Sequence, residues 1–333
     1  MLAAPISLPA NSLNGPRPIN LREDADSILK LLDITFGPLQ DERGRRQIGD
    51  RVFINLNPPL LYRLTTFPGR FRPGFVWVED GQIIANVTLV KSQITGRYLI
   101  ANVAVLPEYR RMGFGRRLLE ETIQYIYHLN GRDIILQVRQ ENSAAIQLYE
   151  SLGFSRLGAM KHWETTTSRL RSRPAEDNMA WTVRKLKSRE WGHAYALDID
   201  SINPDLTWPM PTTRQKYNRS LFSKIDNFLN AQNNETWVVE KLDSNNWGTN
   251  LAGLVNLKSE WRRPLRIELR VHPKARGRIE HILLNKGLDR LSSWRGGTIR
   301  MTHPAEDEIV NVLLSGSNFT KRETLLVMQL VLT

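Results

Sequence analysis

The sequence has no cysteine among its 333 residues, and this absence removes several kinds of chemistry. Without thiols the chain can form no disulfide, no thiolate metal site and no cysteine nucleophile. Long apolar runs are also missing, because stretches such as Leu99–Leu106 and Leu325–Leu332 fall far short of the ~20 residues that span a bilayer. The first eighteen residues lack the basic start of a secretory signal. We therefore expect a cytoplasmic protein with no membrane partner.

Negative charge is scarce relative to positive charge, with 34 Asp and Glu against 46 Lys and Arg and a formal net charge of +12. The excess is spread over both halves, without a basic tail or a repeated basic block. Proteins that bind nucleic acid usually concentrate their charge on one element, so a nucleic-acid partner is disfavoured. The six histidines show no metal-binding spacing, and no metal site is predicted.

Apolar periodicity and turn residues predict alternating strands and helices in the first half. Asp80-Gly81 between two alternating segments is a strong hairpin signal. The predicted strands cover residues 19–21, 75–79, 83–91, 98–106 and 134–138, and a last short strand closes at Trp163. The predicted helices cover residues 23–36, 44–56, 113–129 and 143–152.

The second half repeats this order of elements. Val105-Leu106-Pro107 matches Val271-His272-Pro273 at an offset of 166 residues, and Gly153-Phe154 matches Asn318-Phe319 at 165. Self-similarity at one long period indicates two copies of one fold, and the mixture of elements indicates α/β layers around a mixed sheet. The predicted helices here cover 188–200, 214–231, 279–293 and 305–314. The predicted organisation is a tail (1–16), a first domain (17–164), a polar linker (165–178) and a second domain (179–333).

The most informative segment of the sequence lies between a strand and a helix. The strand ends at Pro107, a short basic turn with Arg110 and Arg111 follows, and Gly113 and Gly115 stand where the helix begins. The first N–H groups of a helix have no intrahelical partner and, with the helix dipole, form an anion site. Glycine allows the backbone to approach a phosphate closely. The dinucleotide fingerprint is excluded because Leu118 stands where a small residue is required.

A second segment, about thirty residues further on, strengthens the signal. Asn142 is a suitable helix N-cap, and the helix after it carries Ala145, Tyr149 and, at its end, Gly153-Phe154. Small residues at the start of that helix allow another group to pack against its first turn. An isolated tyrosine at position 149 would equally suit a core aromatic with a hydrogen-bonded hydroxyl.

Together the two segments resemble the GNAT superfamily of acyl-CoA-dependent N-acyltransferases. The match reads V-x-P-x-x-Arg110-x-x-Gly113-x-Gly115, followed by Asn142-x-x-Ala145-x-x-x-Tyr149-x-x-x-Gly153-Phe154. The resemblance implies that acetyl-CoA is the cosubstrate and that an amine, on a small molecule or a peptide, is the acceptor. The cofactor-binding residues that it implies are Val103, Ala104, Val105, Arg110, Arg111, Met112, Gly113, Phe114, Gly115, Arg116, Asn142, Ala145 and Tyr149.

The chemistry suits these residue types. An amine can attack the acyl carbonyl directly, so the missing cysteines are not needed. A backbone N–H on the strand 103–105 could stabilise the oxyanion, and the Tyr149 phenol could protonate the departing thiolate. Many GNAT enzymes place a carboxylate on the strand before V-x-P, but this chain has Ile100-Ala101-Asn102 there. A water chain remains one option for the base, with Glu79, His162 and Glu164 as weaker candidates.

The second half resembles a decayed copy of the same domain, and the tandem arrangement is similar to that of mycothiol synthase. In the ungapped comparison Ile279 and His281 replace the two glycines, and Asp307 and Leu314 replace Asn142 and Tyr149. We therefore expect one cofactor site per chain, in the first half. The leading hypothesis is an N-acetyltransferase. The alternatives are a non-catalytic acyl-CoA-binding or regulatory module and, on charge alone, an RNA- or ribosome-associated protein.

Overall fold

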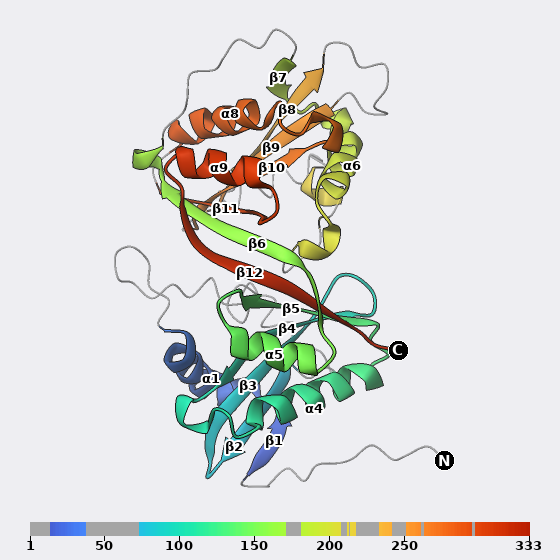
Figure 1. Ribbon diagram of the computed structural model, residues 1–333, viewed down its shortest axis with the longest axis vertical. Helices are drawn as coiled ribbons and strands as arrows, with labels where there is room; N and C mark the ends of the chain where they lie inside the picture. Colours follow the sequence, from blue (N-terminus) through green and yellow to red (C-terminus); the bar gives the residue numbers. More distant parts are fainter. Residues whose placement is uncertain are drawn as a thin grey trace. The chain divides into compact units, whose positions relative to one another are not determined.

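The computed structural model describes residues 14–37, 73–170, 181–207, 212, 214–217, 233–241, 251–260, 263–294 and 297–333. The chain divides into two compact units (Figure 1). The first unit comprises residues 1–137, 143–155 and 328–333, and the second comprises residues 138–142 and 156–327. Among the described helices, none is long and apolar enough to cross a membrane.

The first unit is built on a sheet with the strand order β1-β2-β3-β4-β5. Its strands are β1 (Gly15–Pro18), β2 (Gly74–Glu79), β3 (Gln82–Lys91), β4 (Arg97–Val105) and β5 (Asp133–Arg139). Neighbouring strands run antiparallel except β4 and β5, which run parallel. Asp80 and Gly81, both with positive φ, make the predicted hairpin turn between β2 and β3.

Within the described residues, the first unit has the α-helices α1 (Leu21–Phe36), α4 (Phe114–His128) and α5 (Ser143–Ser151). Asn20 caps α1 because its side chain accepts a hydrogen bond from the N–H of Arg22. α1 and α4 pack against β3 and β4, and they bury Ile28, Leu118 and Leu119 there. A short 3₁₀ turn, η1 (Pro107–Tyr109), joins β4 to the loop before α4. The packing fixes the start of α4 at the end of β4.

The remaining described strands lie wholly or mainly in the second unit, and one of them comes from the first half of the sequence. They are β6 (Ser155–Thr166), β7 (Trp181–Lys185), β8 (Asn233–Lys241), β9 (Leu251–Ser259), β10 (Leu265–Val271), β11 (Thr298–Pro304) and β12 (Thr320–Val331). β6 pairs antiparallel with β11 from Met160 opposite Pro304 to Thr166 opposite Thr298. β10 and β11 are parallel, while β7 to β10 pair antiparallel in chain order.

Helices cover both faces of this second sheet (Figure 1). They are α6 (Trp191–Ser201), α8 (Glu280–Ser292) and α9 (Glu308–Gly316). Consecutive strand residues point to opposite faces, so Val238 joins the apolar cluster with α6 and Val239 joins the larger cluster with α8 and α9. Trp163 of β6 lies in the larger cluster and donates a 2.9 Å hydrogen bond to Asn311 of α9.

The repeat predicted from the sequence recurs in the secondary structure. η1 begins at Pro107 and the corresponding turn η6 (Pro273–Ala275) begins 166 residues later. α5 and α9 begin 165 residues apart, at Ser143 and Glu308. The fold is therefore mixed α/β with two tandem units, as the sequence predicts.

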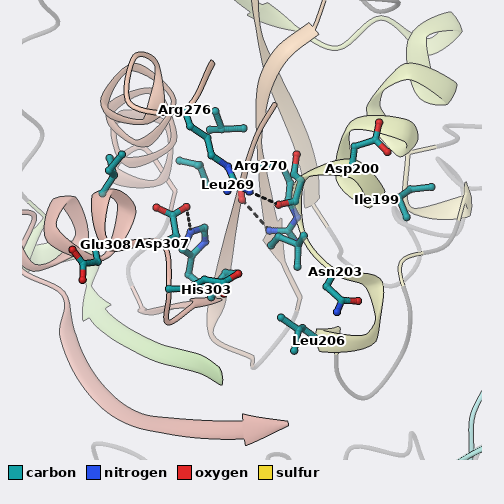
Figure 2. Close-up of a pocket in the computed structure, with 16 residues that line it drawn as sticks. Ile199, Asp200, Asn203, Leu206, Leu269, Arg270, Arg276, His303, Asp307 and Glu308 are labelled. Carbon is teal, nitrogen blue, oxygen red and sulfur yellow. Dashed lines mark hydrogen bonds and ion pairs between the residues drawn. The ribbon is translucent and has the colours of Figure 1, made fainter. Parts of the chain in front are cut away.

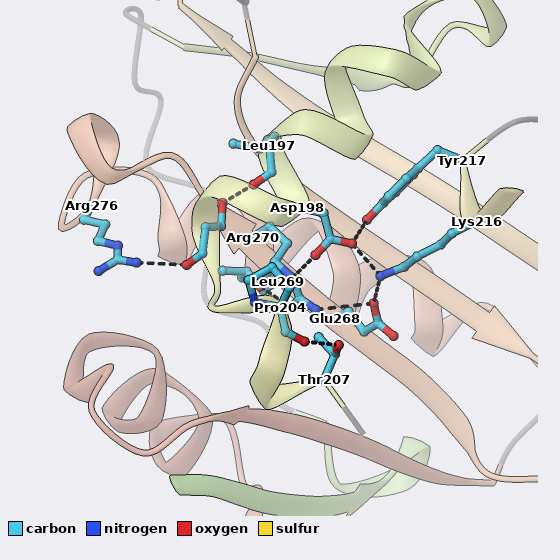
Figure 3. A network of polar contacts seen from close by, with 11 residues as sticks. Leu197, Asp198, Pro204, Thr207, Lys216, Tyr217, Glu268, Leu269, Arg270 and Arg276 are labelled. Carbon is cyan, nitrogen blue, oxygen red and sulfur yellow. Dashed lines mark hydrogen bonds and ion pairs between the residues drawn. The ribbon is translucent and has the colours of Figure 1, made fainter. Parts of the chain in front are cut away.

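A buried network of charges joins α6 to β10 in the second unit (Figure 3). Asp198 accepts hydrogen bonds from Lys216 (2.8 Å) and Tyr217 (2.7 Å) and forms an ion pair with Arg270. Lys216 also contacts Glu268 at 2.5 Å. Burial alone would raise the pKa of Asp198, but the Arg270 and Lys216 cations outweigh burial and hold that pKa well below its usual range.

Several expected segments differ from the structure or lie outside it. The strand predicted to close at Trp163 continues to Thr166, because Thr165 bonds to the carbonyl of Asn318 and Thr166 pairs with Thr298. The predicted linker thus begins within β6 and the turn η2 (Thr167–Arg169). The helix expected at 44–56, most of the tail, linker residues 171–178 and most of the helix at 214–231 lie outside the described residues.

Candidate functional site

A bulge in β4 lies next to the residues that the sequence singles out. β3 and β4 pair with Asn86 opposite Ala104 but Thr88 opposite Ala101, so β4 carries one extra residue there. Asn102 has a φ of 51°, which places it in the left-handed region. The buried Asn86 side chain donates to the Asn102 carbonyl at 2.8 Å, and Asn102 donates to the Thr88 hydroxyl at 3.3 Å. These contacts hold the bulge in place.

The bulge coincides with the point where β4 and β5 separate. Their parallel register runs from Arg97 opposite Asp133 to Ile100 opposite Leu136 and does not continue to the last residues of β4. The three residues Val103, Ala104 and Val105 therefore follow the separation, and their backbone on the side of β5 is not used by that strand. This is the geometry that a ligand needs to add backbone hydrogen bonds to a strand edge.

The loop between β4 and α4 has the conformation of an anion site. Arg111 has a φ of 64°, and Gly113 is the N-cap of α4 with a φ of 87°. A Cβ at Gly113 would meet no atom within 4 Å, so glycine serves the backbone conformation there. A Cβ at Gly115 would lie 3.3 Å from Val105, so that glycine allows α4 to start close to β4.

Side chains around this loop leave its surface accessible. Arg110, Arg111 and Met112 are exposed, and Phe114 is partly buried against Trp77 and Tyr109. Arg110 donates to the carbonyl of Val105 at 3.2 Å, which ties the loop to the end of β4. The N–H groups in the first turn of α4 have no intrahelical partner and point toward the exposed loop. An anion at this position would meet backbone donors and two cationic side chains.

The second motif follows β5 and leads into α5. Asn142 precedes the helix and is exposed, Ala145 is partly buried, and Tyr149 is buried at 5% exposure. Arg116 of α4 forms hydrogen bonds with Ser151 and with Glu120, so α4 and α5 are joined near their loops. Tyr149 packs edge-on against Phe154, with 5.9 Å between ring centroids. Burial raises the pKa of Tyr149, which keeps its hydroxyl protonated.

The structure also places the three weaker candidates for a base. Glu79 ends β2 and accepts a 3.1 Å hydrogen bond from the Trp77 indole. His162 and Glu164 lie on β6 in the second unit, and Glu164 is held by Arg300 and Arg322. Two guanidinium groups bind this carboxylate, and these contacts explain its position on β6.

In the loop of the second unit that corresponds to Arg110–Phe114, an acidic side chain of the protein binds the backbone N–H groups. Gly277 has a φ of 81°, which repeats the left-handed conformation of Arg111. The Glu280 side chain, only 1% exposed, accepts hydrogen bonds from the N–H groups of Gly277 (2.7 Å) and Ile279 (3.1 Å). The ungapped alignment of the two halves does not single out Glu280. An acidic residue at the first position of the helix was the signal available.

Comparison with known proteins bears on the first unit. Residues 47–154 match the model of the acetyltransferase (GNAT) family. The chain carries a GNAT acetyltransferase domain. The match covers both motifs, from the loop before α4 to Gly153-Phe154. The family predicted from the sequence is thus confirmed.

Curated relatives of the GNAT domain include two named N-acetyltransferases. The [ribosomal protein bS18]-alanine N-acetyltransferase of Escherichia coli (strain K12) is 44% identical over 66 residues, which are 20% of this chain and 45% of that protein. N-alpha-acetyltransferase RimI of Mycobacterium tuberculosis is 38% identical over 66 residues, 20% of this chain and 40% of its own length. This chain thus spans less than half the length of each of these relatives.

Solved structures extend the likeness to both units. A GCN5-related N-acetyltransferase from Sphaerobacter thermophilus aligns with a TM-score of 0.61 and 14% identity, covering 96% of each chain. A tandem GNAT protein from the clavulanic acid biosynthesis pathway aligns with a TM-score of 0.53 and 13% identity, covering 96% of this chain and 98% of that one. At these identities the likeness shows the tandem GNAT fold.

Proposed function

We propose that the chain is an N-acetyltransferase that moves an acetyl group from acetyl-CoA to a primary amine, with the cofactor held by the first unit. The observation that carries this proposal is the loop at the start of α4, where a left-handed Gly113 and exposed Arg110 and Arg111 border the first-turn N–H groups. The pyrophosphate of CoA suits this group of donors. The adjacent edge of β4, along which the pairing with β5 has ended, suits the amide-bearing arm of the cofactor.

In the proposed reaction the amine nitrogen attacks the carbonyl carbon of the thioester. A tetrahedral oxyanion forms, and a backbone N–H of Val103–Val105 stabilises it because that strand edge lies past the β4–β5 separation. The C–S bond then breaks, the acetamide is released, and CoA leaves as a thiolate that takes up a proton. The nitrogen loses one proton in the same sequence, so the overall proton count balances.

Tyr149 is proposed as the group that donates to the departing sulfur. Its burial raises the pKa of its phenol, so the hydroxyl is protonated throughout the range in which amines react. The same shift makes full proton transfer less favourable, so the hydrogen bond to sulfur becomes the main part of its contribution. Asn142 and Ala145 would line the other side of the cofactor at the start of α5.

The proposed amine base is solvent, reached through the bulge of β4. The side chains at the bulge are the amides of Asn86 and Asn102. An amide cannot act as the general base, because it does not accept a proton at neutral pH. The Oδ1 atom of Asn86 is buried and has no hydrogen-bond partner among the described residues. A water or an amine N–H beside the bulge would satisfy this oxygen, which would place the nucleophile near the strand edge.

The test is release of free CoA thiol, measured with acetyl-CoA over a panel of amines. The panel includes a peptide with an N-terminal alanine, a linear diamine and an aminoglycoside. These compounds represent three classes of acceptor, namely peptides, small amines and aminoglycosides. Gly113→Val should abolish release, since a β-branched residue cannot adopt the left-handed conformation of the loop. Gly81→Val is the matched control, because Gly81 has a φ of 76° and equally open surroundings in a hairpin remote in sequence from the loop.

Thiol release with at least one amine, lost in the Gly113 variant and kept in the Gly81 variant, supports the proposal. Tight binding of CoA without release for any amine would favour the non-catalytic acyl-CoA-binding module instead. Failure of the wild-type chain to bind CoA at all would contradict both.

A further inference from the structure

The second unit contains a cavity at the place where its own parallel strands separate. β10 and β11 pair only from Leu265 opposite Ile299 to Arg266 opposite Arg300. Beyond that point lies a cavity of about 750 Å³ (Figure 2). Its walls come from the ends of β10 and β11, the end of α6 and the start of α9. A cavity of this volume lies in the range of ordinary small-molecule sites.

The charge of the cavity is opposite to that of the chain. Four carboxylates line it, namely Asp200, Glu306, Asp307 and Glu308, against the two arginines Arg270 and Arg276. Arg270 is already neutralised, because it is buried and paired with Asp198. In a chain with a net charge of +12, this local excess of acid is a specific feature of the cavity. Such a field favours a cationic ligand.

A buried histidine in the cavity wall points to the same kind of ligand. His303 is 3% exposed, and its Nε2 lies 2.8 Å from the Asp307 carboxylate (Figure 2). A carboxylate can only accept, so Nε2 carries the proton and Nδ1 of the neutral ring is an acceptor. Nδ1 is buried and has no partner in the part of the chain that the structure describes. Only a hydrogen-bond donor satisfies such an atom.

Phosphorylated ligands do not suit this unit. In a GNAT-type cleft a phosphate would meet the loop before the helix, but here the Glu280 carboxylate already accepts from Gly277 and Ile279. Asp307 caps α9 through the N–H of Val310, so the second helix start is occupied as well. Both helix N-termini beside the cavity therefore hold carboxylates of the chain.

We propose that the cavity between the separated ends of β10 and β11 is a second ligand site, which binds a small aliphatic amine that carries no phosphate. The ammonium group is held by the carboxylates of the wall, and a ligand N–H reaches the His303 ring. This site is independent of the acetyl-transfer proposal, because its residues all belong to the second unit.

The probe is 1,4-diaminobutane, titrated calorimetrically into the full chain without acetyl-CoA. The controls of equal length are 1,4-butanediol, which has no charge, and succinate, which has the opposite charge. The variant Asp200→Asn/Glu306→Gln removes two exposed carboxylates from the wall, and Asp289→Asn removes one exposed carboxylate outside the cavity. Saturable binding of the diamine should weaken on the order of tenfold in the double variant and stay unchanged in Asp289→Asn.

A second readout follows the histidine itself. In ¹⁵N spectra of the wild-type chain, the Nδ1 signal of His303 should move away from the position of an unprotonated acceptor as the diamine saturates the cavity. Equal binding by the double variant, equal binding of the diol, or preferential binding of succinate would overturn the proposal. Amine binding confined to the acceptor site of the first unit would appear as equal binding by the double variant, so the two sites are distinguished.

Discussion

The carboxylate of Glu280 accepts a hydrogen bond from the backbone N–H of Gly277 at 2.7 Å. Gly277 repeats the left-handed conformation of Arg111, whereas Ile279, with a φ of −126°, does not repeat that of Gly113. In the first unit the position before α4 is occupied by the exposed Gly113, and the helix begins with Phe114. The two loops thus share one left-handed residue but differ at the N-cap of the helix and in what occupies the backbone donors. The first loop is open to an external anion, and the second is closed by a side chain of the protein.

Replacing Glu280 by alanine should open the second loop. We expect a loss of about 1–3 kcal/mol in the free energy of unfolding, because the buried N–H of Ile279 and the partly buried N–H of Gly277 lose their acceptor. Inorganic pyrophosphate should restore part of that loss, and it should stabilise the variant more than the wild type. Thermal unfolding with and without pyrophosphate measures this, with Glu308→Ala as an exposed control at a helix start. Equal stabilisation of all three proteins would contradict the closed-loop account.

Gly113→Ala should weaken the binding of acetyl-CoA. A left-handed conformation costs an alanine about 1 kcal/mol, and the loop would relax away from the geometry that aims its N–H groups. Gly81→Ala carries the same conformational cost in the β2–β3 hairpin. Both variants should lose similar stability by chemical denaturation, but only Gly113→Ala should lose affinity by calorimetry. Unchanged affinity in Gly113→Ala would remove the loop from the cofactor site.

Tyr149→Phe should lower the turnover of acetyl transfer by roughly 10²-fold or more while the KM for acetyl-CoA stays close to that of the wild type. The hydroxyl is lost but the ring still packs on Phe154. Because burial raises the pKa of Tyr149, the wild-type rate should not fall through ionisation of this phenol as the pH rises toward 10. An unchanged turnover in the variant would exclude Tyr149 from the reaction.

The Asp198 network should make the second unit sensitive to acid. The pKa of this carboxyl in the folded chain lies below its unfolded value of about 3.9, so its contribution to stability is present above about pH 4 and is lost as the pH falls further. Asp198→Asn should cost roughly 3 kcal/mol at pH 7, because the buried Arg270 keeps only its longer, 3.8 Å ion pair with Glu268. Urea unfolding between pH 3 and 7 should show a shallower pH dependence in the variant. Parallel curves for the two proteins would refute this assignment.

Much of the fold could be predicted from the sequence because its signals are local. Asp80-Gly81 gave the hairpin, Pro107 marked the end of β4, and the matched Pro273 revealed the second unit. The starts and ends of β4, α4 and α5 lie within a residue or two of their predicted bounds. The family followed from the same segments, and the match over residues 47–154 confirms it.

The remaining features depend on contacts between distant residues. The bulge at Asn102 is held by Asn86, sixteen residues earlier, and neither residue has a pattern that marks a bulge. β6 extends past Trp163 because β11 pairs with it, and that partner lies more than a hundred residues further along the chain. Glu280 and Gly277 are close in the sequence, but the sequence does not show that they form a hydrogen bond. That hydrogen bond depends on the left-handed backbone of the loop.

We propose that the chain holds one CoA, at the loop before α4 of the first unit. Calorimetric titration of CoA into the full chain tests it most directly. We predict one CoA bound per chain, with binding abolished by Gly113→Val and retained in Gly81→Val. Two CoA molecules per chain, or one that persists unchanged in Gly113→Val, would contradict the account.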